Sequence, residues 1–346
     1  MQSRIFCCLF LSCLLLMNLT NAALGFDWNE YKNTFLSKDG RIIDFYRGDM
    51  SHSEGQGYGL LLALANGDAK TFELIWKWSK DNLQKRKGDA LFCWSWGKRS
   101  NGQWGIMDYN NATDGDILIA WALAMASEKW NNKAYRKEAL KIIKSIKKNL
   151  IQDVKGKKVI LPGYYGFDKK DSLLLNPSYM INRAFPEFAK LDDPSFWKSV
   201  YETQKELLKH CQFGQWRLPS NWILLDKSSL KIKPARKAMF SYDAYRIFLY
   251  DVWASTYVFK ESFKYLANFF ERNDFIPEEV RLSHFVSIKD AGAGMYAMLG
   301  RFAKAIGNNE LAKRLFSKAD KKIKFEKKNY YSLTLYLLAK ANLGAT

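Results

Sequence analysis

Two kinds of helical segment alternate along this chain, and that alternation limits its fold more than any other feature. In Ala139 to Leu150 and Ala312 to Ile323, apolar residues recur three and four positions apart, which indicates amphipathic helices with lysine-rich outer faces. Other segments are apolar on nearly all sides, which indicates burial; they begin near residues 54, 114, 242, 291 and 330. Buried and surface helices that alternate in this way form hairpins around a common axis.

We expect twelve helices, at 27–36, 54–66, 69–83, 114–129, 135–150, 181–191, 196–211, 242–255, 260–272, 291–306, 309–323 and 330–343. Paired in sequence order, they predict an all-α fold, an (α/α)6 barrel of six inner and six outer helices. An open α-solenoid is the alternative, although the sequence has no fixed repeat length. Lys158 to Leu161 is the clearest expected strand.

The first 22 residues are typical of a secretory signal peptide. Arg4 precedes an apolar run from Ile5 to Met17, and Thr20-Asn21-Ala22 is a small-x-small cleavage site. We therefore expect residues 23–346 to form a single barrel domain that is periplasmic or secreted, with no membrane-spanning segment. Two cysteines remain outside the signal, and they are either a disulfide pair or two buried thiols: Cys93 and Cys211.

The chain is strongly basic, with a formal charge of +19. Such a charge permits an anionic partner, but the lysines are spread along helix faces, which favours a solvated basic surface. No nucleic-acid-binding motif is present. The three histidines lack metal-ligand spacing, so we expect no metal and no other cofactor.

A lone acid stands where the first apolar segment begins. Glu54 lies in Ser53-Glu54-Gly55-Gln56-Gly57-Tyr58-Gly59, directly before an apolar helix. The glycines allow backbone or ligand to approach closely, and the helix places the acid between core and cavity. Partial burial raises the pKa of a carboxyl, as a proton donor in catalysis requires. A carboxylate that merely complements the helix dipole is the alternative.

Two other apolar helices also begin with acids. Asp114 and Asp116 follow two asparagines, and amides with carboxylates suit a polyol, although one of these residues can be a simple helix cap. Asp243 and Arg246 are three residues apart and are expected to pair on one helix face. That pair is either purely structural or a carboxylate held ionised as a general base.

Aromatic residues accompany these acids. Trp94 and Trp96 lie in Phe92-Cys93-Trp94-Ser95-Trp96-Gly97, and Tyr179 ends Asn176-Pro177-Ser178-Tyr179. Most of the twelve tryptophans are expected to pack in the core, but a few in a groove would stack on sugar rings. Two acids in different environments, an aromatic groove and the absence of a nucleotide motif together indicate glycoside hydrolysis.

At these motifs the sequence resembles glycoside hydrolase family 8 and, within it, the periplasmic endoglucanases that accompany bacterial cellulose synthases. The resemblance rests on the heptapeptide around Glu54, on Phe92 to Gly97, and on the motifs Ala112-Thr113-Asp114-Gly115-Asp116, Asn176-Pro177-Ser178-Tyr179, Tyr242-Asp243-Ala244-Tyr245-Arg246 and Tyr330-Tyr331-Ser332-Leu333. These motifs occur in order from about residue 27 to 340. Two positions depart from the family pattern: Asn221 stands where members often have aspartate, and Trp121 where tyrosine is common.

The resemblance implies a cellulase, an endo-β-1,4-glucanase that acts with inversion. Glu54 would be the general acid and Asp243 the general base. The residues that would bind substrate or place the water are Asp114, Asp116, Tyr179, Trp94, Trp96 and Arg246. A β-glucan is the implied partner, together with the cellulose-synthase or secretion machinery, and we expect a monomer.

A helix N-terminus lowers the pKa of Glu54, so we hypothesise that the charge of Asp114 raises it again. Alternatives for the function remain. They are a family member that cleaves xylan, mixed-linkage glucan or chitosan, a catalytically silent glucan-binding accessory, and a binder of anionic polymers.

Overall fold

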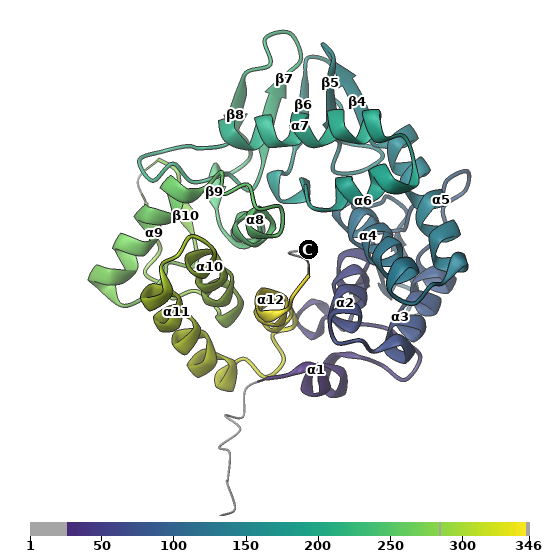
Figure 1. The fold of residues 1–346 in the computed structure, drawn as a ribbon, viewed down its shortest axis with the longest axis horizontal. Coiled ribbons are helices and arrows are strands. Elements are labelled where there is room, and N and C mark those ends of the chain that lie inside the picture. Colours follow the sequence, from purple (N-terminus) through teal and green to yellow (C-terminus); the bar gives the residue numbers. More distant parts are fainter. Residues whose placement is uncertain (1–25, 284, 344–346) are drawn as a thin grey trace, which may run out of the picture.

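The computed structural model describes residues 26–283 and 285–343, so the predicted signal peptide lies outside the described residues. Within them, twelve α-helices form a ring of six inner helices surrounded by six outer helices (Figure 1). The predicted (α/α)6 barrel is confirmed. No helix in this part of the chain has the length and apolar character needed to cross a membrane.

The inner helices are α2 (Ser53–Ala65), α4 (Thr113–Lys129), α6 (Ala184–Leu191), α8 (Tyr242–Trp253), α10 (Ala293–Ala305) and α12 (Tyr330–Lys340). The outer helices are α1 (Trp28–Phe35), α3 (Ala69–Asn82), α5 (Lys133–Asn149), α7 (Pro194–His210), α9 (Lys260–Asn273) and α11 (Asn309–Lys322). The predicted bounds differ from these by at most three residues. Helical periodicity was a sufficient signal because nearly every helix buries either all of its surface or one stripe of it.

Ten short strands lie in the loops between helices. They are β1 (Ser51–His52), β2 (Ser95–Lys98), β3 (Trp104–Asp108), β4 (Ile151–Val154), β5 (Lys157–Ile160), β6 (Ser172–Leu175), β7 (Ile223–Asp226), β8 (Ile232–Pro234), β9 (Met239–Phe240) and β10 (Val280–Arg281). They pair as antiparallel sheets of order β1-β2-β3, β4-β5, β6-β7-β8 and β9-β10. Only β5 was predicted, because segments this short carry too few residues to establish an alternating pattern.

Glycines let α2 and α4 approach each other closely at their N-terminal ends. A Cβ atom on Gly57 would lie 2.6 Å from the Cβ of Leu118, and one on Gly115 would lie 2.8 Å from the backbone nitrogen of Glu54. Side chains larger than hydrogen at these two positions would force the helices apart. The close contact therefore fixes the distance between the first turns of α2 and α4, where Glu54 and Asp114 lie.

A buried amide ties α2 to the loop before it and to the outer helix α3. The Gln56 side chain has no exposed surface, and its Oε1 accepts a hydrogen bond from the backbone N–H of Ile42 at 2.7 Å. Its Nε2 donates to the backbone carbonyl of Gly40 at 3.2 Å and to Ser79 Oγ at 2.9 Å. Because every partner is itself fixed by secondary structure, this network holds the start of α2 in one position.

Cys93 and Cys211 are both buried and are not bonded to each other. Burial raises the pKa of each thiol. The alternative of two buried thiols is therefore the one that the structure contains.

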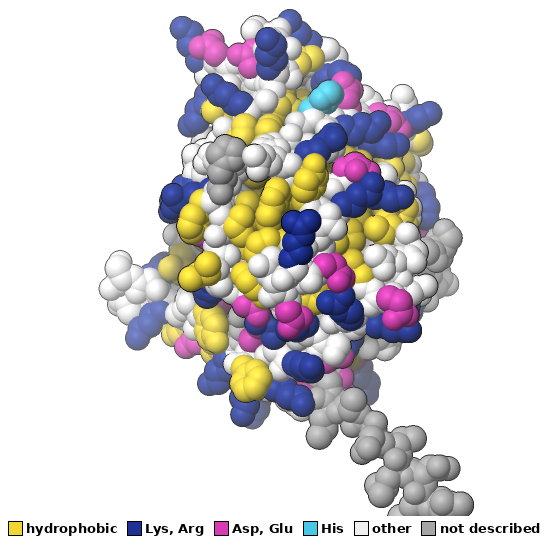
Figure 2. Space-filling view, turned by 90° about the vertical axis from the view of Figure 1, so that its left-hand side faces the viewer, with side chains coloured by type: hydrophobic (Ala, Val, Ile, Leu, Met, Phe, Trp, Pro, Cys, Tyr) yellow, Lys and Arg dark blue, Asp and Glu magenta, His cyan; other side chains and the backbone are white. Residues whose placement is uncertain are grey.

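The basic residues form a mixed surface. On the side of the molecule that includes α9 and α11, Figure 2 shows Lys and Arg side chains scattered among Asp and Glu, around a central group of hydrophobic side chains. Arg314 on α11 pairs with Glu271 on α9 at 2.6 Å, and Lys318 on α11 pairs with Asp274, the residue after α9, at 2.7 Å. The charges of Arg314 and Lys318 are thus neutralised by these carboxylates. Exposed pairs of this kind stabilise little and are typical of a solvated surface.

We predict that Gly57→Ala destabilises the protein by about 1–3 kcal/mol, because the added methyl group overlaps Leu118 at a helix–helix contact. Gly59→Ala on the same helix is the matched control, since its methyl group would lie 3.0 Å from Ile42 Cγ1 and 3.3 Å from Ile75 Cδ1, both longer than the 2.6 Å contact with Leu118. Urea denaturation of both variants measures the difference. Equal stability of the two variants would contradict the close α2–α4 contact.

Candidate active site

A cavity of about 600 Å³ opens among the N-terminal ends of the inner helices. Six of the eight residues predicted for the site line it: Glu54, Trp94, Asp114, Tyr179, Asp243 and Arg246. The cavity is also lined by residues that the sequence did not single out, including Asp44, His52, Tyr242, Glu278, Lys289 and Tyr331.

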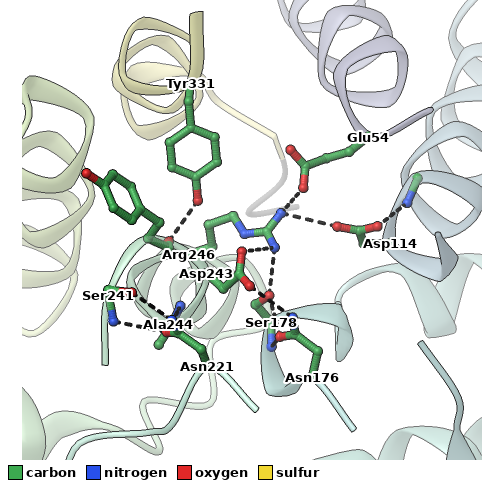
Figure 3. Close-up of polar contacts among 12 residues, drawn as sticks. Glu54, Asp114, Asn176, Ser178, Asn221, Ser241, Asp243, Ala244, Arg246 and Tyr331 are labelled. Carbon is green, nitrogen blue, oxygen red and sulfur yellow. Dashed lines mark hydrogen bonds and ion pairs between the residues drawn. The ribbon is translucent and has the colours of Figure 1, made fainter. Parts of the chain in front are cut away.

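Arg246 lies at the centre of the polar contacts in this cavity (Figure 3). Only 1% of its side chain is exposed, and its guanidinium binds carboxylates from three helices. Nη1 contacts Glu54 and lies 3.2 Å from Asp114, and Nη2 lies 3.3 Å from Asp243. The predicted pairing of Asp243 with Arg246 is therefore present, and it belongs to a larger ion cluster.

Each carboxylate is placed by the first turn of an inner helix. Glu54, Asp114 and Asp243 occupy the first turns of α2, α4 and α8, respectively. These turns expose backbone N–H groups and the positive end of the helix dipole, which stabilise negative charge. The three carboxyl groups therefore lie at one face of the barrel, and the buried guanidinium of Arg246 supplies the opposing charge.

The neighbouring carboxyls Glu54 and Asp114 differ in their electrostatics. Burial would raise the pKa of Glu54, but the charge of Arg246 and smaller contributions, among them a hydrogen bond with Asp114, lower it below its usual value. Burial, followed by the charge of Glu54, raises the pKa of Asp114 well above its usual value. When the pair holds one proton, these shifts therefore favour its residence on Asp114 rather than on Glu54.

This arrangement corrects the hypothesis that Asp114 raises the pKa of Glu54. The hypothesis considered only the negative charge of Asp114, whereas the direct contact between Arg246 and Glu54 has the larger effect. Sequence spacing could not predict that contact, because the two residues are far apart in the chain and meet only when the barrel closes.

Asp243 is oriented by the segment before α6. Asn176 Nδ2 donates to Asp243 Oδ2 at 3.2 Å, and Arg246 Nη2 donates to Ser178 Oγ at 2.7 Å. Asn176 Oδ1 accepts from the backbone N–H of Ser178 at 3.0 Å, which fixes the amide. With 35% of its side chain exposed, Asp243 is open to the cavity, in contrast to the 1% exposed at Asp114.

Two aromatic residues border the carboxylates. The Tyr179 ring lies 5.9 Å from the Arg246 guanidinium and 6.5 Å from the ring of Trp222. Trp94 lines the cavity, and its indole N–H donates to Asp108 Oδ2 at 2.8 Å, so the ring is held by its polar edge. A ring fixed in this way leaves an apolar face for stacking against a sugar.

Two predicted substrate-binding residues lie elsewhere. Asp116 is fully buried, accepts from the backbone N–H of Phe92 at 2.8 Å and from Asn111 Nδ2 at 2.7 Å, and has its pKa raised to about 7 by burial. Trp96 lies in β2 and packs against Trp78 and Trp104. Neither residue lines the cavity. Asp116 is turned away from it because residues two positions apart on a helix face different directions.

Sequence reasoning missed Tyr331 and His52 as cavity residues. Tyr331 OH donates to the backbone carbonyl of Tyr242 at 2.7 Å, which links α12 to the start of α8. His52 Nδ1 accepts from the backbone N–H of Gly55 at 3.0 Å and caps α2. Tyr331 lies within a motif that was quoted for the resemblance, and His52 directly precedes another, so their position at helix starts was the available signal.

The described residues contain no group of three or more His, Cys, Asp or Glu side chains arranged to hold a metal ion. The cavity instead offers three carboxyls in two unlike surroundings. Asp114 and Glu54 share a proton beside Arg246, while Asp243 faces the cavity in contact with an amide and the same arginine.

Comparison with known proteins decides the family, because the sequence profile of glycosyl hydrolases family 8 matches residues 1–344. The chain belongs to glycosyl hydrolase family 8. It is 40% identical over 228 residues to an endoglucanase of Cellulomonas uda, which covers 65% of this chain and 62% of that protein. It is 37% identical over 234 residues to a probable endoglucanase of Novacetimonas hansenii, covering 67% and 68%.

Solved structures of this family have the same fold. The endo-β-1,4-glucanase CMCax of Acetobacter xylinum superposes with a TM-score of 0.78 and 31% identity, covering 91% of this chain and 95% of that one. The family 8 endoglucanase Cel10 of Klebsiella pneumoniae gives 0.77 and 31%, covering 90% and 97%. The alignments with these structures thus extend over nearly their whole chains, whereas the match to the Cellulomonas relative spans less than two thirds of that protein.

We predict that Asp114→Asn moves the alkaline limb of the pH–rate profile to lower pH. In the native site Asp114 and Glu54 together retain a proton against the charge of Arg246. Asparagine cannot hold a titrating proton, so in the variant only Glu54 titrates beside Arg246. Glu54 therefore loses its proton at lower pH than the native pair does. The measurement is kcat/KM between pH 4 and 9 for both proteins, and an unchanged alkaline limb would contradict a shared proton.

Proposed function

We propose that this protein is an endo-β-1,4-glucanase that hydrolyses cellulose-type glucan with inversion, using Glu54 as general acid and Asp243 as general base. The observation that carries the proposal is the position of these two carboxyls, which contact different nitrogens of one buried guanidinium. The endoglucanases among its relatives support the reaction type. An inverting mechanism places its two carboxyls roughly 6.5–9.5 Å apart, which leaves room for a water molecule between base and sugar.

In the proposed reaction, Glu54 gives its proton to the glycosidic oxygen as the bond from that oxygen to the anomeric carbon breaks. Asp243 takes a proton from water, whose oxygen forms the new bond to the anomeric carbon on the opposite face. The Glu54–Asp114 pair supplies the first proton, because it retains one proton in the free site. In each cycle Glu54 gives up one proton and Asp243 takes up one proton. The site is reset when Asp243 releases its proton to solvent and Glu54 takes one up again.

The remaining cavity residues have positioning roles in this proposal. Arg246 contacts the carboxylate of Asp243 and fixes its direction. Tyr179 places the attacking water or a sugar hydroxyl, and Trp94 stacks on a sugar ring beside the point of cleavage. Asp114 binds the sugar at the cleavage point once it has passed its proton to Glu54.

We also propose that the protein works outside the cytoplasm, in the periplasm or the medium. The secretory pattern of residues 1–22 supports this location. A cellulose-synthesis or secretion machinery is the proposed protein partner, and a monomer is the proposed active form. A β-glucan chain would enter the open cavity as the substrate.

We expect Glu54→Gln and Asp243→Asn each to lower kcat on carboxymethylcellulose by about 10²–10⁴-fold, the usual contribution of a general acid or base. Viscosity and reducing ends are followed together, because an endo-acting enzyme lowers viscosity before many ends appear. Glu310→Gln on the outer helix α11 is the control, since its carboxylate only pairs with the exposed Lys313. Xylan, lichenan and chitosan are assayed in parallel.

The two roles are separated with dinitrophenyl β-cellobioside, whose leaving group departs without protonation. Glu54→Gln should regain activity on this substrate, whereas Asp243→Asn should not, because water still needs a base. If the unaltered protein cleaves none of the polymers but still binds glucan, the proposed function is contradicted. Equal recovery of both variants would contradict the assignment of the two roles.

A further inference from the structure

The helix that carries Asp243 is capped from outside. The N-cap residue of α8 is Ser241, and its own side chain makes no capping hydrogen bond. Asn221, which lies in the loop before β7, takes over this function: its Oδ1 accepts from the backbone N–H of Ser241 at 3.0 Å and of Ala244 at 3.3 Å. Ala244 is the third residue of the helix, and its N–H is the group that a serine or asparagine cap ordinarily binds.

The cap is held firmly in place (Figure 3). Asn221 Nδ2 donates to Ser241 Oγ at 2.7 Å, and the backbone N–H of Asn221 donates to the carbonyl of Met239 at 2.7 Å. The next residue, Trp222, is stacked on Phe167 at 6.0 Å and lies under the Arg236 guanidinium at 3.8 Å. The amide therefore presents its oxygen to α8 in a fixed direction.

The first turn of α8 also carries the reacting charge. Asp243 lies between the two residues whose N–H groups Asn221 binds, and Arg246 follows within the same turn. A shift of this turn would move Asp243 relative to Glu54 on the opposite helix. The charged and titratable groups that face Asp243 or its turn are Glu54 on α2, Asp114 on α4, Tyr179 before α6, Arg246 on α8, Glu278 and Lys289 before α10, and Tyr331 on α12.

We propose that Asn221 is a positioning residue for the general base. As a cap, it fixes the turn that aims Asp243 into the cavity. The inference rests on the proposed role of Asp243 as general base.

Three variants test this inference. Asn221→Ala removes the cap. Asn221→Asp keeps an oxygen that can accept both N–H groups, with Ser241 Oγ turning to donate, and adds a negative charge. Asn308→Ala is the matched control, because Asn308 caps the outer helix α11 through the N–H of Leu311 at 3.1 Å and does not line the cavity. Melting temperature, kcat, KM and the pH–rate profile on carboxymethylcellulose are measured for each.

We expect the two alanine variants to lose similar amounts of melting temperature, while only Asn221→Ala loses kcat, by about tenfold and with little change in KM. Asn221→Asp should regain melting temperature. Its kcat should recover as well, because a carboxylate oxygen can accept the same two N–H groups.

A kcat that stays low in Asn221→Asp while its melting temperature recovers overturns the link between the capping oxygen and the position of the base. A kcat for Asn221→Ala that falls no further than that of Asn308→Ala overturns the positioning role. Asp243→Asn is assayed alongside: if it stays active, the assigned base is wrong, and if it is inactive while both Asn221 variants match their controls, only the present inference fails.

Discussion

The whole cavity depends on the buried charge of Arg246. Three inner helices bring Glu54, Asp114 and Asp243 to one place, and the side chain of Asp114 is almost entirely removed from solvent. Three neighbouring carboxyls are costly to bring together without a cation. With the guanidinium between them, they lie in different surroundings: Glu54 and Asp114 are neighbours and mostly buried, and Asp243 is open to the cavity. Acid–base catalysis requires this difference.

The barrel explains why these residues meet. Inner helices that run in the same direction point their N-termini to one face, where unpaired N–H groups favour anions. Gly57 and Gly115 bring α2 and α4 close enough for Glu54 and Asp114 to share a proton, and Asn221 completes the start of α8. The outer helices, which exchange ion pairs such as Arg314–Glu271, cover this inner ring. The positions of the carboxyl groups in the cavity are therefore set by helix packing and helix ends rather than by long loops.

Much of this arrangement was predictable from local patterns, since helix periodicity gave the twelve helices and the spacing of Asp243 and Arg246 gave their pairing. Such patterns could not predict contacts between segments that are far apart in the sequence. The Arg246–Glu54 contact reverses the expected pKa shift, and Asp116 turns inward to bind Phe92 although it stands only two residues from Asp114. Apart from β5, the strands escaped prediction because they consist of two to five residues whose pairing exists only after the helices assemble.

The stereochemistry of the first product shows whether two carboxyls on opposite faces of the sugar ring carry out a single displacement by water. Proton NMR of cellopentaose hydrolysis, recorded faster than the products mutarotate, distinguishes the anomers. Because the reaction inverts the β-linkage, we expect the α-anomer to appear first and the β-anomer to form only through mutarotation. An initial β-anomer would mean that a carboxylate attacks the sugar directly, and it would contradict the roles proposed for Glu54 and Asp243.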